Sequence, residues 1–247
     1  MKAVLSFVII GFLALEAPTQ TPTAASLIQD SQDRVSALER KVDVTNGTLT
    51  ISVRFAARIL GRKSSGNADY RVTVRNGKDA KNELVGTHSF SDSTVASMVD
   101  RELRRREDKP IMNLYLEKAF PWTRYLSRAD KKREFMATLD SDSEIVSGKR
   151  CFLVSYTLDA EGDSVSAEGE GKIWIDSGTL LPVRAYFDFD MSTHRGKAEV
   201  ICSSDFSSLN SGIPVILRSE TQTIPKFLFI SVGSIRTVVE QSDFNLE

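Results

Sequence analysis

Alternation of apolar and polar residues dominates the second half of the chain. Within Gly171–Phe189, Ile173 and Ile175 share one face of a strand, while Lys172 and Asp176 lie on the other. The apolar face continues on the next strand with Val183, Ala185, Phe187 and Phe189. A sheet with one apolar face needs a cover for that face. The pattern therefore predicts an antiparallel sheet covered by helices, by a bound apolar ligand, or by both.

The same alternation predicts strands on both sides of this segment. The most regular strand runs from Thr48 to Leu60, and a polar loop over residues 61–68 leads to a returning strand near Tyr70–Val74. The remaining strands are expected at residues 83–90, 135–139, 151–158, 172–176, 183–189, 198–206 and 214–223, with a final run ending near residue 244. Most connections between them are short, as an antiparallel meander requires.

Helical patterns occur in two regions. Ser26 and Gln29 form a capping box before an amphipathic run, which predicts a helix over residues 27–42. In the middle of the chain, Asp92 or Ser93 caps a second predicted helix, and Pro110 occupies the first turn of a third. The second helix presents Val95, Met98, Val99 and Leu103 on one face. These helices are the predicted cover of the sheet.

One block of residues is similar to a known family. The block W-I-D-x-x-T-x-L-P-V-R spans Trp174–Arg184, follows a G-K-R-C-F-L-V strand and precedes a strand that ends in S-D-F. This combination resembles the LolA/LolB-like superfamily of bacterial envelope proteins. The resemblance implies a mainly β (α+β) fold, a curved, incompletely closed antiparallel β-barrel with helices plugging the concave face. It covers residues 26–247, which we expect to form a single LolA-like domain.

The first residues are typical of an export signal. A lysine precedes an apolar run over residues 3–15, which is too short to span a bilayer, and small or hydroxylated residues follow. We expect residues 1–25 to be a signal peptide cleaved after Ala17 or Ala25; an uncleaved N-terminal anchor is the alternative. No cysteine lies near either site, so the lipobox of the anchored LolB-like members is missing. The expected location is the periplasm, as a soluble exported protein.

The two cysteines invite a disulfide in an exported protein. Cys151, however, lies on the face opposite Phe152 and Val154, whereas Cys202 lies on the apolar face of its strand. Thiols on opposite faces of one sheet do not come within bonding distance. The pattern therefore predicts two free thiols, unless a bulge shifts the register of one strand.

Composition and motifs argue against several other functions. Basic and acidic residues number 32 and 33, so no strong field recruits nucleic acid. His88 and His194 form no zinc spacing with the cysteines, and Ser166 stands where a nucleophile elbow needs glycine. Asp140–Glu144 alternates like calcium ligands but lacks the glycine of such a loop, so we expect a hairpin turn there. Acidic neighbours cancel most of the charge of Arg104–Arg106. We expect no metal, no cofactor, no catalytic residue and no enzymatic activity.

The predicted ligand site is the apolar inner face together with aromatic residues of the helical block. It consists of Ile51, Val53, Phe55, Phe120, Trp122, Tyr125, Phe152, Val154, Tyr156 and Phe187. The three aromatic residues around Pro121 form either a lid over a cavity or core packing between helices and sheet, and the pattern leaves both open. Burying an acyl chain contributes about 0.8 kcal/mol per methylene, so a dry cavity supplies affinity without a reacting group.

The family resemblance and the apolar face together indicate an exported carrier or binding protein of the bacterial cell envelope. The expected partners are a lipid, an acyl chain or a lipoprotein, together with a protein of the inner or outer membrane. Nucleic acid is not expected as a partner. The alternative is an envelope sensor or regulatory binding module that signals to a membrane partner.

Overall fold

The computed structural model describes residues 22–247, apart from residues 92, 94–96, 98, 100, 102–106, 108, 195, 228 and 229. Most of the predicted signal peptide, most of the helix predicted to begin at residue 92 or 93, and the Arg104–Arg106 run lie outside these residues. Within the part of the chain that is described, no helix is both long and apolar enough to cross a membrane.

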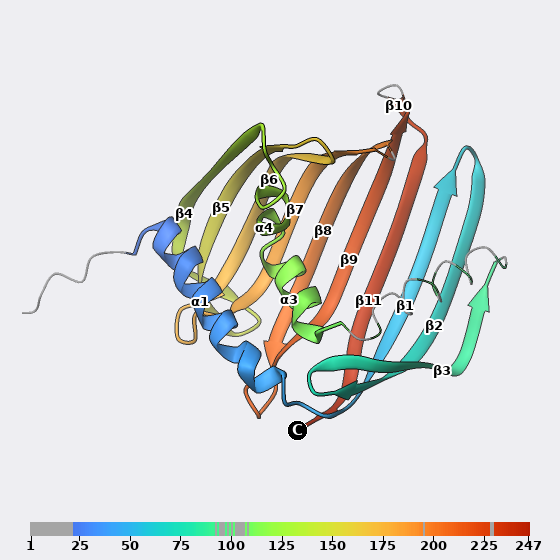
Figure 1. Cartoon of the computed structure of the whole chain (residues 1–247), viewed down its shortest axis with the longest axis horizontal. Coiled ribbons are helices and arrows are strands. Elements are labelled where there is room, and N and C mark those ends of the chain that lie inside the picture. The colour runs from blue at the N-terminus through green and yellow to red at the C-terminus, as the bar shows by residue number, and fades with distance from the viewer. Residues whose placement is uncertain are drawn as a thin grey trace, which may run out of the picture.

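A single antiparallel sheet forms the body of the molecule (Figure 1). Its strands are β1 (Gly47–Ile59), β2 (Arg62–Arg75), β3 (Lys78–Phe90), β4 (Lys132–Val146), β5 (Lys149–Glu161), β6 (Val165–Asp176), β7 (Pro182–Thr193), β8 (Gly196–Ser208), β9 (Pro214–Phe227), β10 (Ile230–Ser231) and β11 (Gly233–Leu246). The order across the sheet is β3-β2-β1-β11-β9-β8-β7-β6-β5-β4, and β10 pairs with β9. Pairing of β1 with the C-terminal strand β11 joins the β1–β3 strands to the rest of the sheet. β3 and β4 remain the edges of an open, curved sheet. The predicted fold class is confirmed.

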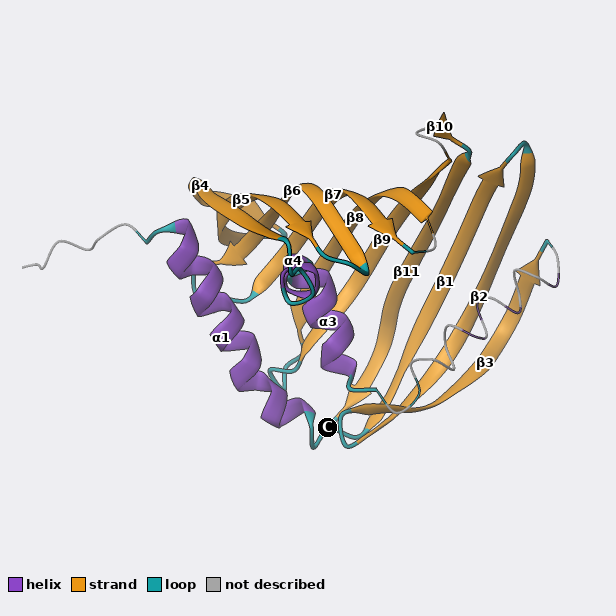
Figure 2. Cartoon of the chain, turned by 45° about the horizontal axis from the view of Figure 1, so that its top comes forward, coloured by secondary structure: helices purple, strands orange, loops and turns teal. Residues whose placement is uncertain are grey.

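Within the described residues, the helices α1 (Ala24–Val42), α3 (Ile111–Ala119) and α4 (Trp122–Leu126) lie on the concave side of this sheet (Figure 2). α1 packs on β4, α3 on β7 and β9, and α4 on β5 and β6. α1 begins one turn earlier than predicted because the Thr23 hydroxyl oxygen, rather than that of Ser26, caps it by accepting from the Ser26 backbone N–H at 3.1 Å. The third predicted helix begins directly after Pro110, as expected.

The hairpin between β1 and β2 is tighter than the sequence pattern predicted. Residues 61–68 were expected to be a polar loop, but Arg62 already pairs with Ile59, which leaves a two-residue turn of Leu60 and Gly61. Backbone pairing along β1 overrides the polar composition of this stretch, because the long antiparallel strand β1 offers hydrogen bonds to alternate residues all along β2. β1 itself alternates as predicted, with Leu49 and Ile51 buried and its three outward residues from Arg54 to Arg58 exposed.

The predicted turn at Asp140–Glu144 is likewise part of a strand. These residues continue β4, and shifts in the β4–β5 register near Ser141 absorb the irregular pattern. The true turn is Ser147-Gly148, where both residues have positive φ angles of 51° and 77°. Two positive φ values are the signature of a tight hairpin turn, in which glycine is favoured at the second position.

The two cysteines lie in different hydrophobic clusters and are free. Cys202 belongs to the main core on the concave side, whereas Cys151 packs with Val146 and Val183 against Trp174. The assignment of Val183 to the inner face was wrong, because a register shift between β6 and β7 after Trp174 moves it into the Cys151 cluster. Trp174 accordingly serves packing on the outer side of the sheet.

Asp176, at the centre of the family-like block, organises the turn between β6 and β7. Its carboxylate oxygen Oδ1 accepts hydrogen bonds from the backbone N–H of Gly178 at 2.8 Å and of Thr179 at 3.3 Å. The Lys149 ammonium lies 3.4 Å from the other oxygen. Burial alone raises the pKa of this carboxyl, but the hydrogen bonds and the Lys149 ammonium outweigh burial and hold the pKa below its usual value. The Trp174–Arg184 block therefore forms and stabilises the turn between β6 and β7.

We expect Asp176→Asn to lower the free energy of unfolding by about 1–2 kcal/mol at neutral pH, because it removes a buried, hydrogen-bonded charge. The folded pKa lies below the unfolded one, so the ionised carboxylate stabilises the fold above the unfolded pKa, and this contribution disappears as the pH falls through the folded pKa. Urea unfolding of both proteins at about pH 7 and at a series of acid pH values extending well below about pH 4 measures this difference. A gap that is unchanged by acid contradicts the prediction.

Candidate functional site

Most of the predicted ligand-site residues form a buried aromatic cluster under α4. The Trp122 ring lies 4.4 Å from that of Tyr156, 5.1 Å from Phe135 and 5.6 Å from Phe120, measured between ring centroids. Trp122 and Tyr156 are each 3% exposed. Of the two alternatives that the sequence left open, the structure shows core packing for this group.

The cluster extends along the concave face toward the centre of the sheet. Tyr125 makes an edge-on contact with Phe189 at 5.8 Å, and Phe187 stacks on Phe189 at 4.9 Å. Val154 is fully buried in the same core, and Phe152 is half-buried against it. These rings pack between α4 and the concave side over β5 to β7. α4 therefore covers this part of the sheet through aromatic packing.

The three predicted residues of β1 lie apart from this cluster. Ile51 is 3% exposed and lines a groove beside α3. Val53 is half-buried next to both the main core and the small cluster of Ala68 and Tyr70. Phe55 is half-buried farther along β1 and does not line the groove, but it lines a separate, open cavity of about 350 Å³ with Arg54, Ala56, Arg218, Arg236 and Val238. The structure thus brings Ile51 and Phe55 to two different cavities and places Val53 between them.

The groove is the main candidate site. It encloses about 480 Å³ between α3, β1, β9 and β11. Leu49 and Ile51 form one apolar wall, and Leu114 and Tyr115 of α3 form the wall opposite, with Ile111, Val215, Ile216, Phe244 and Leu246 completing the lining. A volume of this size lies within the range of about 300–1,000 Å³ that is typical of ligand pockets. The groove can hold an apolar chain.

Polar side chains gather at the rim of the groove. Lys109, Arg124, Asp79 and Glu117 bring charges of both signs, and Asn113 and Gln241 add amides. Inside, the Tyr115 ring packs 4.9 Å from Phe206, and burial raises the pKa of the Tyr115 phenol well above its usual value. The phenol therefore stays neutral at every physiological pH. The arrangement suits a ligand with an apolar body and a polar end at the rim.

A polar centre beneath α3 was not predicted from the sequence. The Lys118 ammonium donates to the Thr221 hydroxyl at 3.2 Å and to the Cys202 sulfur at 3.4 Å, and the Ser204 hydroxyl donates to Ser219 at 3.0 Å. Burial raises the pKa of the Cys202 thiol, but the Lys118 charge and the hydroxyl donors outweigh burial and lower the pKa overall. The alternation of residues 198–206 does place Ser204 next to Cys202 on the inner face, so the sequence contained an indication of a polar group there. α3 is therefore held to the sheet partly by polar contacts.

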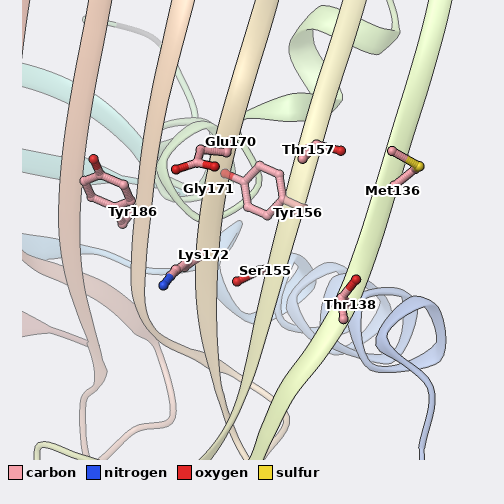
Figure 3. Close-up of a pocket in the computed structure, with 9 residues that line it drawn as sticks. All are labelled: Met136, Thr138, Ser155, Tyr156, Thr157, Glu170, Gly171, Lys172 and Tyr186. Carbon is pink, nitrogen blue, oxygen red and sulfur yellow. The ribbon is translucent and has the colours of Figure 1, made fainter.

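A smaller cavity of about 240 Å³ lies over β4 to β7 and is lined mainly by outward-facing residues (Figure 3). Ser155 and Thr157 flank Tyr156 on β5, Glu170 and Lys172 flank Gly171 on β6, and Met136, Thr138 and Tyr186 complete the lining. Its lining thus combines short hydroxyl side chains, one charge of each sign, a methionine and two tyrosines. No feature of it favours a particular ligand.

Comparisons with known proteins concern the fold. No protein-family model and no curated protein matches the chain. A domain described as an outer membrane lipoprotein-sorting protein from Vibrio parahaemolyticus is 10% identical, with 90% of each chain covered and a TM-score of 0.33. A DUF1329 family protein from Desulfovibrio piger is 14% identical over 89% of this chain and 92% of that chain, with a TM-score of 0.31. A chain of the Pseudomonas aeruginosa MucA/MucB complex is 10% identical over 85% and 93%, with a TM-score of 0.23. None of these likenesses bears on what this chain binds.

Proposed function

We propose that this protein binds an acyl chain of a lipid or lipoprotein in the groove between α3 and strands β1, β9 and β11, as a non-catalytic carrier or binding module of the bacterial envelope. The observation that carries the proposal is the groove itself, about 480 Å³ with apolar walls and a charged rim. Residues of this kind recognise an amphipathic molecule, because the walls desolvate the chain and the rim keeps its polar end hydrated.

The packing around the groove supports this use. The wall formed by α3 is joined to the sheet partly through Lys118, Thr221 and Cys202, whose polar groups can exchange their partners for water. The α4 side is closed by aromatic packing, together with a hydrogen bond from the Tyr125 hydroxyl to the Met191 sulfur at 3.3 Å. Within this proposal the chain is exported to the periplasm, in keeping with its signal-like first residues.

Leu114→Glu tests the groove directly. Leu114 is half-buried on α3 and lines the groove, so a carboxylate there places a charge against the apolar ligand, where ionisation is costly. We expect the affinity for a fluorescent fatty acid to fall at least about tenfold, which corresponds to about 1.4 kcal/mol. Displacement titrations with unlabelled fatty acids of increasing length measure the effect.

Leu116→Glu is the matched control. Leu116 is half-buried on the same helix and packs against the core, but it does not line the groove. The same substitution there is expected to lower the melting temperature and to leave the affinity of the folded protein within about twofold, since the residue does not touch the ligand. Equal loss of affinity in both variants contradicts the assignment of the groove, and fatty acid binding that survives Leu114→Glu unchanged contradicts it as well.

A further inference from the structure

The tip of the β1–β2 hairpin exposes a large apolar side chain. Leu60 is 79% exposed, more than any other large apolar residue in the described part of the chain. Its φ angle is +49° and that of Gly61 is +81°, so the two residues form a tight hairpin turn with two left-handed positions. Leucine is disfavoured in this backbone conformation because its Cβ crowds the following carbonyl.

Two other hairpins of the same sheet show what such a turn ordinarily contains. The β2–β3 turn has Asn76 and Gly77 at φ +49° and +69°, and the β4–β5 turn has Ser147 and Gly148 at +51° and +77°. Small polar residues suit the first position, and asparagine is the most common choice. At the β1–β2 turn the chain instead carries a leucine that is strained and exposed to water. Neither folding nor solubility accounts for this residue, which points to an interaction.

A second exposed apolar residue lies beside this turn. Ile230 of β10 is 70% exposed, and the Leu60 backbone N–H donates to the carbonyl of Val232, two residues further along, at 2.9 Å. The hydrogen bond links the β1–β2 tip to the β10 segment at the same end of the sheet (Figure 1). Together, Leu60 and Ile230 form an apolar tip, which we call the hairpin tip.

On β1 and β2 the charge beside the hairpin tip is basic, whereas next to β10 the Lys226 ammonium is paired with the carboxylates of Asp190 and Glu199. Residues 54–68 and 221–239, which form the ends of the strands at this tip, contain basic residues and no aspartate or glutamate. Arg58, Arg62 and Lys63 are exposed, and none of the three has an ion-pair partner among the residues that the structure describes. An apolar point surrounded by unpaired basic side chains complements an anionic lipid surface, where the apolar groups enter the acyl boundary and the cations meet phosphates.

We propose that the hairpin tip docks this protein on an anionic phospholipid bilayer, with Leu60 and Ile230 inserted at the headgroup–acyl boundary and Arg58, Arg62 and Lys63 on the lipid phosphates. The tip lies at the end of β1 opposite Leu49 and Ile51, so docking there leaves the groove free. This role is independent of the ligand that the groove takes.

The test is co-sedimentation of the full chain with vesicles of phosphatidylcholine alone or mixed with phosphatidylglycerol. We expect binding to the mixed vesicles, and a loss of about tenfold in affinity for Leu60→Asn combined with Ile230→Ser. Arg62→Ser and Lys63→Ser should each lower the affinity about fivefold at low salt. Leu60→Asn fits the turn better than leucine, so its melting temperature should stay equal or rise, which separates loss of docking from loss of folding.

A local readout and a control complete the test. Leu60→Trp places a fluorophore at the tip, and brominated lipids should quench the emission of this variant on the mixed vesicles more than that of the wild-type protein, which reports Trp122 and Trp174 alone. Val44→Ser removes an apolar residue that is 70% exposed at the opposite end of β1, and it should leave the affinity for the mixed vesicles unchanged. Failure of the protein to bind mixed vesicles, equal binding to neutral vesicles, an unquenched Trp at position 60, or an equal loss in Val44→Ser overturns the proposal. Protein capture without vesicle binding points instead to a protein partner.

Discussion

Trp122→Ala is expected to lower the free energy of unfolding by about 3–5 kcal/mol, the range for truncating a buried tryptophan. Trp122 is 3% exposed and joins α4 to the sheet through ring contacts with Tyr156 and Phe135. Its removal leaves a cavity at the point where the rings of Phe120, Phe135 and Tyr156 converge. Chemical denaturation followed by far-ultraviolet circular dichroism measures the change in the free energy of unfolding, because this signal reports mainly the unfolding of the sheet.

Trp174→Ala is the control for this prediction. Trp174 is the other tryptophan of the chain, but it lies half-buried on the outer side of the sheet, beside Cys151 and Val183. We expect Trp174→Ala to lower the free energy of unfolding clearly less than Trp122→Ala does, since less of the Trp174 side chain is removed from water in the folded state. If the two variants lose equal stability, α4 does not contribute the core packing that the structure shows.

Gly171→Ala is expected to lower the free energy of unfolding by about 1–3 kcal/mol or more, because the added methyl group overpacks the core. Gly171 lies on the inner face of β6 directly opposite Tyr156 (Figure 3), and an added Cβ would overlap the Tyr156 hydroxyl and ring and stand 2.6 Å from the Tyr186 carbonyl oxygen. The backbone of β7 cannot move without breaking its pairing with β6. An equilibrium urea titration of the variant gives the size of the loss.

Gly178→Ala provides the comparison at a position without this constraint. A Cβ on Gly178 meets only the Asp176 carboxylate oxygen, at 3.4 Å, so the substitution should change stability by about 0.5 kcal/mol or less. In addition, Tyr156→Leu should restore part of the stability lost in Gly171→Ala, because it removes the ring that the new methyl group strikes. Simple addition of the two losses would show that the ring and the glycine are not coupled.

The strand pattern was largely predictable because the faces of β1 and β6 are so unequal. Leu49 and Ile51 against Arg54 and Arg58 specify one orientation of β1, since a slip by one residue exposes the whole apolar set. The face of Cys151 followed from the same argument. The alternation pattern did not predict bulges. Val183 lies in the outer cluster because the local register shift depends on how the β6–β7 turn closes and not on the composition of either strand.

The candidate site was predictable only in part, because it depends on where a helix lies on the sheet. Apolar residues such as Ile51 and Trp122 were identified, yet one lines the groove and the other is sealed in the core. Sequence periodicity reports which face of α3 is apolar but not which strands it covers. The contact of Lys118 with Cys202 and Thr221 joins residues that are far apart in the sequence, and no local pattern contains it.

The most direct test of acyl-chain binding in the groove is a methyl-resolved NMR titration of the full chain with a long-chain fatty acid. The groove methyl groups of Ile51, Ile111 and Leu114 should shift and saturate together, and those of Val35 and Ile173, buried in the core away from the groove, should not. Saturating shifts confined to the groove set are the result we predict. Absence of any shift at saturating fatty acid, or shifts that leave Ile51 and Leu114 unaffected, would contradict the account.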